Sequence, residues 1–155
     1  MTTKAKLEII PMQAQHLDEI YALMEVFYQE DGDYPFHKDR ASKALELLLA
    51  NASLGQAWAF MIDGKIAGYM IMTLGYSIEF GGYTALLDEL YVRKGMRRQG
   101  IGSAAIQVML NKCDEMGIRA IDLEVEKSNA AAHDFYIKNG FRDGWRTQMR
   151  RWNRR

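Results

Sequence analysis

The sequence predicts an α/β protein with a mixed central sheet of about seven strands and about four helices on the two faces of the sheet. Strand-like and helix-like patterns alternate in the second half of the chain, and helical crossovers join parallel strands. In the first half, Asp63-Gly64 separates two apolar runs, which is typical of an antiparallel hairpin. A chain of 155 residues has the length of one domain, so residues 1–155 are expected to form one.

The first expected elements are a short strand and two helices. The strand is "KLEII", which Pro11 ends. Apolar residues at spacings of three and four then predict an amphipathic helix across 17–28. Gly32 and Pro35 interrupt this pattern, and a second helix is expected across 41–48.

Antiparallel strands should follow these helices. The hairpin covers residues 57–72, "AWAFMIDGKIAGYMIM". A second turn at Gly81-Gly82 leads into "TALLDELYV", residues 84–92. This stretch is expected to be the central strand of the site discussed below.

The second half predicts alternating helices and strands. A helix is expected from about Gly100 to Met116, closed by Gly117, and a strand in "RAIDLEV". Asn129 can cap a short helix, "AAAHDFYIKN". The segment "FRDGWRTQMRRW", residues 141–152, is expected to form a final strand or hairpin.

Composition limits the function. The formal net charge is zero, whereas general nucleic-acid binders usually carry a basic excess. The single cysteine, Cys113, cannot form an internal disulfide, which fits a reducing compartment. Neither a signal peptide nor an apolar run long enough to cross a membrane is visible. We expect a cytoplasmic protein with no nucleic-acid or membrane partner; the oligomeric state stays open, with a homodimer among the alternatives.

One basic, glycine-containing stretch suggests an anion site. In "VRKGMRRQGIGSAA", residues 92–105, two glycines stand where a helix should begin. Backbone N–H groups at a helix start attract phosphate, and glycine lets the backbone approach it closely. Gly100, Gly102 and Ala105 also fit the G-x-G-x-x-A pattern of dinucleotide folds, but seven residues of "RKGMRRQ" separate them from the preceding strand. A P-loop is rejected because G-K-[ST] is missing.

Two motifs together carry a more specific resemblance. "RRQGIG" matches the pattern [QR]-x-x-G-x-[GA], and "NAAAHDFYIKNGF" matches N-x-x-A-x-x-F-Y-x-x-x-G-F. At this spacing they resemble the GNAT superfamily of N-acetyltransferases, and the order of elements over residues 7–152 is similar to that fold. The resemblance implies the GNAT (acyl-CoA N-acyltransferase) fold, acetyl-CoA as co-substrate and direct transfer of the acetyl group to an amine.

The resemblance also implies where acetyl-CoA binds. Its pyrophosphate would lie on the amides of residues 98–103, and its pantetheine arm would run along the strand 84–92 like an added strand. The residues implied for acetyl-CoA are Leu90, Tyr91, Val92, Arg97, Arg98, Gln99, Gly100, Ile101, Gly102, Ser103, Asn129, Ala132 and Tyr136.

Two residues are candidates for catalysis. Tyr136 matches the family tyrosine near the sulfur and would act as general acid, although an aromatic residue packed on a helix explains it too. Glu89 precedes the "LYV" stretch, where several members carry an acidic base that often acts through water; a structural carboxylate is the alternative. Asp88 should face the other way unless a bulge interrupts the strand.

The amine should enter near two stretches, "FYQEDGDYPF" and "GYSIEFGGY", which mix aromatic and acidic residues. Such residues attract a cationic amine by charge and by cation–π contact, although solvated loops would look the same. We expect a small primary amine such as a polyamine, an amino acid or an aminoglycoside. The alternatives are a protein or peptide N-acetyltransferase and a non-catalytic acyl-CoA-binding sensor. The candidate residues are Tyr28, Glu30, Asp31, Asp33, Tyr34, Phe36, Tyr76 and Glu79.

Other reactive side chains are expected to be structural. Cys113 lies on the apolar stripe of its helix, so core packing explains it better than nucleophilic catalysis. His16, His37 and His133 show no metal-ligand spacing with Cys, Asp or Glu, so no metal is expected.

Overall fold

The computed structural model describes residues 5–32 and 34–153, so the predicted wall residue Asp33 lies outside the described residues. The chain forms two compact units, the first ending at Glu124 and the second beginning at Val125. The first unit contains the whole sheet and three long helices, and the second contains one helix. In the described part of the chain, no helix is both long enough and apolar enough to cross a membrane.

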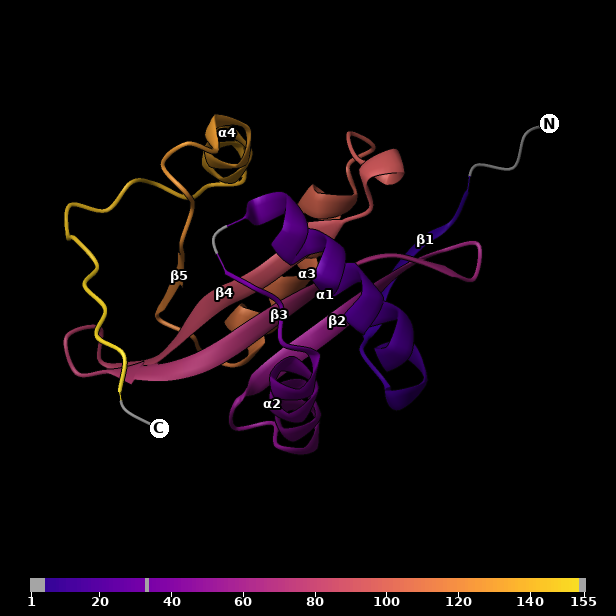
Figure 1. Cartoon of the computed structure of the whole chain (residues 1–155). Coiled ribbons are helices and arrows are strands. Elements are labelled where there is room, and N and C mark those ends of the chain that lie inside the picture. The colour runs from indigo at the N-terminus through magenta and orange to yellow at the C-terminus, as the bar shows by residue number, and fades with distance from the viewer. Residues whose placement is uncertain (1–4, 33, 154–155) are drawn as a thin grey trace. The chain divides into compact units, whose positions relative to one another are not determined.

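The sheet has five strands in the order β1-β2-β3-β4-β5 (Figure 1). The first four are antiparallel neighbours, and β5 lies parallel to β4. The expected hairpin is confirmed, because β2 and β3 are joined by Asp63 and Gly64, which have φ angles of 48° and 76°. The strands are β1 (Leu7–Pro11), β2 (Gly55–Ile62), β3 (Lys65–Ser77), β4 (Gly82–Val92) and β5 (Ala120–Leu123).

Helices cover both faces of this sheet within the first unit, as expected (Figure 1). On one face, α1 and α2 pack on a buried apolar cluster that includes Ile20, Leu45 and Tyr69. On the other face, α3 packs on β3, where Cys113 Sγ lies 3.4 Å from Met72 Sδ. The helices are α1 (Leu17–Asp31), α2 (Lys38–Ala50), α3 (Ile101–Glu115) and α4 (Ala130–Lys138), with short 3-10 turns η1 (Ala14–His16) and η2 (Lys94–Met96).

The expectation of about seven strands is wrong: the sheet has five. The missing strands were expected in residues 141–152, which contain neither helix nor strand. Phe141, Trp145 and Met149 would share one face of a strand, but among the described residues this segment pairs with no strand. Trp145 and Met149 are 90% and 91% exposed.

A bulge interrupts β4 just before Glu89. Glu89 pairs with Ile71 and Leu87 pairs with Met72, which leaves Asp88 as an extra residue in β4. Ile71 belongs to the apolar cluster under α1 and α2, and cross-strand partners share a face of the sheet. The side chain of Glu89 therefore lies on the α1 face, where it contacts Tyr28.

Candidate active site

The carboxylate of Glu89 lies between two phenol groups. The hydroxyl of Tyr28, on α1, donates to Oε1 at 2.8 Å. The hydroxyl of Tyr69, on β3, donates to Oε2 at 2.7 Å. Each oxygen of this carboxylate therefore has its own hydrogen-bond donor, and the two donors come from different layers of the fold.

Burial has the largest effect on the pKa of Glu89. It raises the pKa of Glu89 above its usual value, while the hydrogen bonds from Tyr69 and Tyr28 lower it and the charges of Asp88 and Asp31 raise it. Burial and the charge of Glu124 likewise raise the pKa of Asp88, although that residue keeps exposed surface. Carboxyl groups with a raised pKa are suited to accepting a proton.

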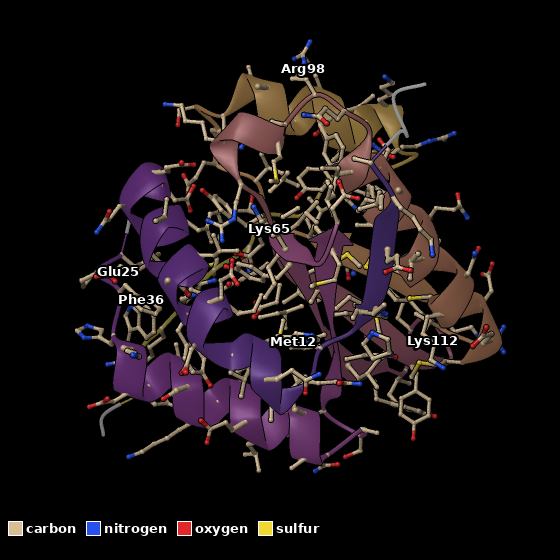
Figure 2. The ribbon with its side chains drawn as sticks, turned by 90° about the vertical axis from the view of Figure 1, so that its right-hand side faces the viewer. Met12, Glu25, Phe36, Lys65, Arg98 and Lys112 are labelled. Carbon is tan, nitrogen blue, oxygen red and sulfur yellow. The ribbon has the colours of Figure 1, made fainter. Side chains whose placement is uncertain are left out.

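A pocket of about 410 Å³ lies between the last turns of α1 and the segment that follows them. It is lined by Glu25, Tyr28, Gln29, Gly32, Tyr34, Pro35 and Phe36. The ring of Phe36 packs 5.4 Å from the ring of Tyr28, and Figure 2 shows Phe36 beside Glu25 at the junction of α1 and α2. Tyr28 thus belongs both to the pocket wall and to the hydrogen-bonded partners of Glu89.

The residues predicted to bind the amine fall into two groups. Tyr28, Tyr34 and Phe36 line this pocket, and Asp31, Tyr76 and Glu79 are not among its lining residues. Tyr76 lies instead on β3, 66% exposed and edge-on to the ring of Tyr83 at 5.4 Å.

Two residues at the site were not predicted. Tyr69 is buried in the core, where an aromatic residue is ordinarily explained by packing. Only the strand register indicates its role, because it pairs Tyr69 with Tyr91, two residues from Glu89. Glu25 lines the pocket one turn before Tyr28 on α1, a spacing that places two side chains on one helix face.

The loop before α3 presents backbone N–H groups. Gly100 is the N-cap of α3 with a φ of 80°, and nothing lies within 4 Å of the position that a Cβ would take there. Among the described residues, no side chain caps this helix start. The amides of Ile101, Gly102 and Ser103 lie in the first turn, where N–H groups have no acceptor within the helix and where the positive end of the helix dipole lies.

Arg97 and Arg98 differ in their surroundings, although both were expected to bind phosphate. Arg97 donates from Nη2 to Glu30 at 2.7 Å and from Nε to the carbonyl of Val92 at 2.8 Å, and its guanidinium lies 5.2 Å from the centre of the Tyr91 ring. Arg98 adopts a positive φ of 65° and stands at the outer edge of the loop (Figure 2).

The edge of β4 is open next to this loop. Pairing with β5 runs from Thr84 to Leu87, and no strand of the described residues pairs with β4 on that side beyond this point. Leu90, Tyr91 and Val92, expected to contact the pantetheine arm, lie in this open stretch. Exposed backbone groups at a sheet edge can pair with an extended ligand.

The predicted cofactor residues Asn129, Ala132 and Tyr136 lie in the second unit. Asn129 caps α4, where its side chain accepts a hydrogen bond from the amide of Ala132 at 3.1 Å. The ring of Tyr136 packs edge-on to Phe135 and Phe141 at 5.1 and 5.8 Å. Burial raises the pKa of Tyr136 to about 12, so its phenol carries its proton at neutral pH.

Cys113 and His16, which were expected to be structural, are held within the fold. Cys113 is buried, and burial raises the pKa of its thiol to about 11, so very little thiolate forms at neutral pH. His16 Nδ1 accepts a hydrogen bond from the amide of Gln13 at 3.0 Å. Within residues 5–32 and 34–153, no three His, Cys, Asp or Glu side chains gather in a way that could hold a metal ion.

Comparison with known proteins identifies the family. The acetyltransferase (GNAT) family profile matches residues 17–141, and the chain belongs to this family. The chain is 24% identical over 125 residues to aminoalkylphosphonate N-acetyltransferase of Salmonella typhimurium, covering 81% of this chain and 78% of the relative. The protein is thus an enzyme of the GNAT N-acetyltransferase type.

Solved structures share the fold. An integron cassette protein from the Cole Harbour salt marsh metagenome superposes with a TM-score of 0.83, at 29% identity over 93% of this chain and 89% of that one. A possible acetyltransferase from Clostridium difficile superposes with a TM-score of 0.83 at 23% identity, over 96% of this chain and 99% of that one. An aminoglycoside N-acetyltransferase in complex with CoA superposes with a TM-score of 0.82 at 17% identity, over 98% of each chain.

Proposed function

We propose that the protein transfers the acetyl group of acetyl-CoA directly to the primary amine of a small cationic acceptor. The observation that carries this proposal is the hydrogen bond between Glu89 and Tyr28, because Tyr28 also lines a pocket that is mainly aromatic and contains one carboxylate. When bound, acetyl-CoA would supply an acetyl group activated as a thioester.

The residues present fit acetyl-CoA. The amides of Ile101, Gly102 and Ser103 at the uncapped start of α3 suit its phosphates, and Gly100 leaves space there. The open edge of β4 from Leu90 to Val92 suits an extended arm. Tyr136, protonated at neutral pH, would give a proton to the departing thiolate.

Glu89 would remove a proton from the incoming ammonium, because only a neutral amine can attack a carbonyl carbon.

The pocket supports a cationic acceptor. Among the described residues that line it, one is a carboxylate, three are aromatic and none is basic. Cations bind well to such walls by charge and by contact with aromatic faces. Asp31 also lies close enough to raise the pKa of Glu89.

The lining argues against an acceptor with its own phosphonate group, although one relative is an aminoalkylphosphonate N-acetyltransferase. A phosphonate would need basic partners, and Arg97 and Arg93 already pair with Glu30 and Glu19.

A panel of acceptors with acetyl-CoA, read by thiol release, tests this proposal. It should compare a diamine, spermidine, an aminoglycoside, an aminoalkylphosphonate and a lysine peptide. Release with the free cationic amines supports the proposal. Release with the peptide alone would favour a protein N-acetyltransferase, and CoA binding without release for any amine would favour a sensor.

A further inference from the structure

The two phenols that hold Glu89 have unequal access to the pocket. Tyr69 is 0% exposed and belongs to the core between β3, α1 and α2. Tyr28 keeps part of its surface exposed and lines the pocket. A substrate in the pocket can therefore touch Tyr28 but not Tyr69.

We propose that Tyr69 is a positioning residue that fixes Glu89, and that Tyr28 is a catalytic residue that relays the proton of the acceptor ammonium to Glu89. This inference rests on the proposed function. It follows from the two hydrogen bonds, one to each carboxylate oxygen, and from the place of Tyr28 between the pocket and the carboxylate.

The relay is balanced without another reactant. The ammonium N–H bond breaks and its proton moves to the hydroxyl oxygen of Tyr28, while the proton of Tyr28 moves to Oε1 of Glu89. The net result is a neutral amine and a protonated Glu89, with Tyr28 unchanged; Glu89 later returns the proton to solvent. Burial and the charge of Glu89 raise the pKa of Tyr28, so a tyrosinate would not accumulate and the two protons move together.

The charged and titratable groups that face Glu89 come from three elements. They are Tyr28 and Asp31 on α1, Tyr69 on β3 and Asp88 on β4. The two tyrosines stabilise the carboxylate by donating to it, whereas the two aspartates disfavour it. Removal of either phenol hydroxyl should therefore raise the pKa of Glu89.

A titration of the free protein tests the hydrogen bonds without any substrate. The side-chain carbon of Glu89 can be followed by NMR in protein labelled with ¹³C-glutamate, and its signal is identified by its loss in Glu89→Gln. In Tyr28→Phe and in Tyr69→Phe the midpoint should rise by about one pH unit, the effect of a lost hydrogen bond to a charged group.

Tyr21→Phe is the matched control. Tyr21 also belongs to α1 and also donates to a glutamate, Glu46, at 3.2 Å, but it is not among the groups that shift the pKa of Glu89. Its replacement removes the same kind of bond and leaves the same ring, so the midpoint of Glu89 should not move. If Tyr69→Phe also leaves the midpoint in place, the positioning role of Tyr69 is wrong.

Kinetics separate the two roles. In Tyr69→Phe, the acid limb of kcat should move to higher pH while kcat at the alkaline plateau stays within about threefold of the wild type. In Tyr28→Phe, the plateau itself should fall by about a hundredfold, the typical contribution of a positioned proton-transfer group. Equal plateaus in the two variants would overturn the relay.

These outcomes are distinguishable from failure of the proposed function. If no amine is acetylated but the midpoint rises in both variants, the hydrogen bonds to Glu89 stand, and the proposed function and the relay that rests on it both fail. If amines are acetylated and the midpoint stays fixed in both variants, the proposed function stands and this inference fails.

Discussion

Arg97 and Glu30 form an ion pair, with 2.7 Å between Nη2 and Oε2, that ties the loop before α3 to the last turn of α1. The hydroxyl of Tyr91 donates to the other oxygen of Glu30 at 3.3 Å. The proposed phosphate site and the helix that lines the acceptor pocket are thereby connected through side chains. The ion pair is more than a third exposed on both sides, so it serves to order the loop more than to stabilise the fold.

Replacing Arg97 by Ala should weaken CoA binding more than it destabilises the fold. The variant loses the contacts with Glu30, with the Val92 carbonyl and with the Tyr91 ring, which hold the loop in place. We expect the Kd of CoA to rise about tenfold by calorimetry, with a loss of at most ~1 kcal/mol in stability. Lys112→Ala, which removes a surface ion pair with Glu115, is the control. An unchanged Kd in Arg97→Ala would contradict this role.

Gly100→Ala should damage the start of α3 through its backbone alone. A side chain at a φ of 80° costs about 1–2 kcal/mol, although a Cβ would meet nothing there. The variant should lose about that much stability in urea unfolding and should bind CoA more weakly. Gly95→Ala, in the same loop but without a positive φ, is the control and should change neither quantity. Equal behaviour of the two variants would show that Gly100 has no special role.

Tyr136→Phe should lower turnover by about tenfold to a hundredfold with little change in the Kd of CoA. The substitution keeps the ring that packs on Phe135 and Phe141, so the fold should be intact by circular dichroism. Because the pKa of Tyr136 is raised to about 12, the wild-type enzyme should not lose this acid below about that pH. Unchanged turnover would leave Tyr136 as a packing residue.

Glu89→Gln should remove the acid limb of the pH–rate profile. The wild-type rate should fall as the pH falls through the pKa of Glu89, which lies above that of an ordinary glutamate. Retention of the wild-type profile in the variant would contradict a role as base.

The same variant tests the linkage between ionisation and stability. Folding raises the pKa of Glu89, so the folded protein binds this proton more tightly than the unfolded chain does. The wild-type protein therefore loses stability as the pH rises from the unfolded pKa through the folded pKa, and Gln does not titrate. We expect Glu89→Gln to gain stability relative to the wild type between acidic and neutral pH in urea unfolding. A difference that does not change with pH would mean that the pKa of Glu89 is not shifted by folding.

Local patterns predicted most of the fold. The Asp63-Gly64 turn, the glycine before α3 and the Asn129 cap each fix a backbone conformation by themselves, and the structure has each of them in place. The absence of strands in residues 141–152 could not be predicted in this way, because a strand forms only beside a partner strand, and the sequence of a segment does not say whether a partner is present.

The site residues that could be predicted are those that a sequence pattern picks out one at a time; the contacts between them could not be predicted. Glu89 and Tyr28 were both expected, in different roles, and the structure joins them by a hydrogen bond. Regular alternation predicts the face of Glu89, whereas no spacing rule located the bulge at Asp88 in advance. Tyr69 donates to Glu89 from a buried strand, where an aromatic residue is ordinarily explained by packing alone.

The activity proposed for this enzyme is acetylation of a small cationic amine. The most direct test is the rate of acetyl-CoA-dependent thiol release with spermidine or a diamine, compared with a lysine peptide of the same charge, in the wild type and in Glu89→Gln. We expect release with the free amines, little release with the peptide, and a rate at neutral pH at least about a hundredfold lower in Glu89→Gln. Release with the peptide alone, or equal rates in the two proteins, would contradict this proposal.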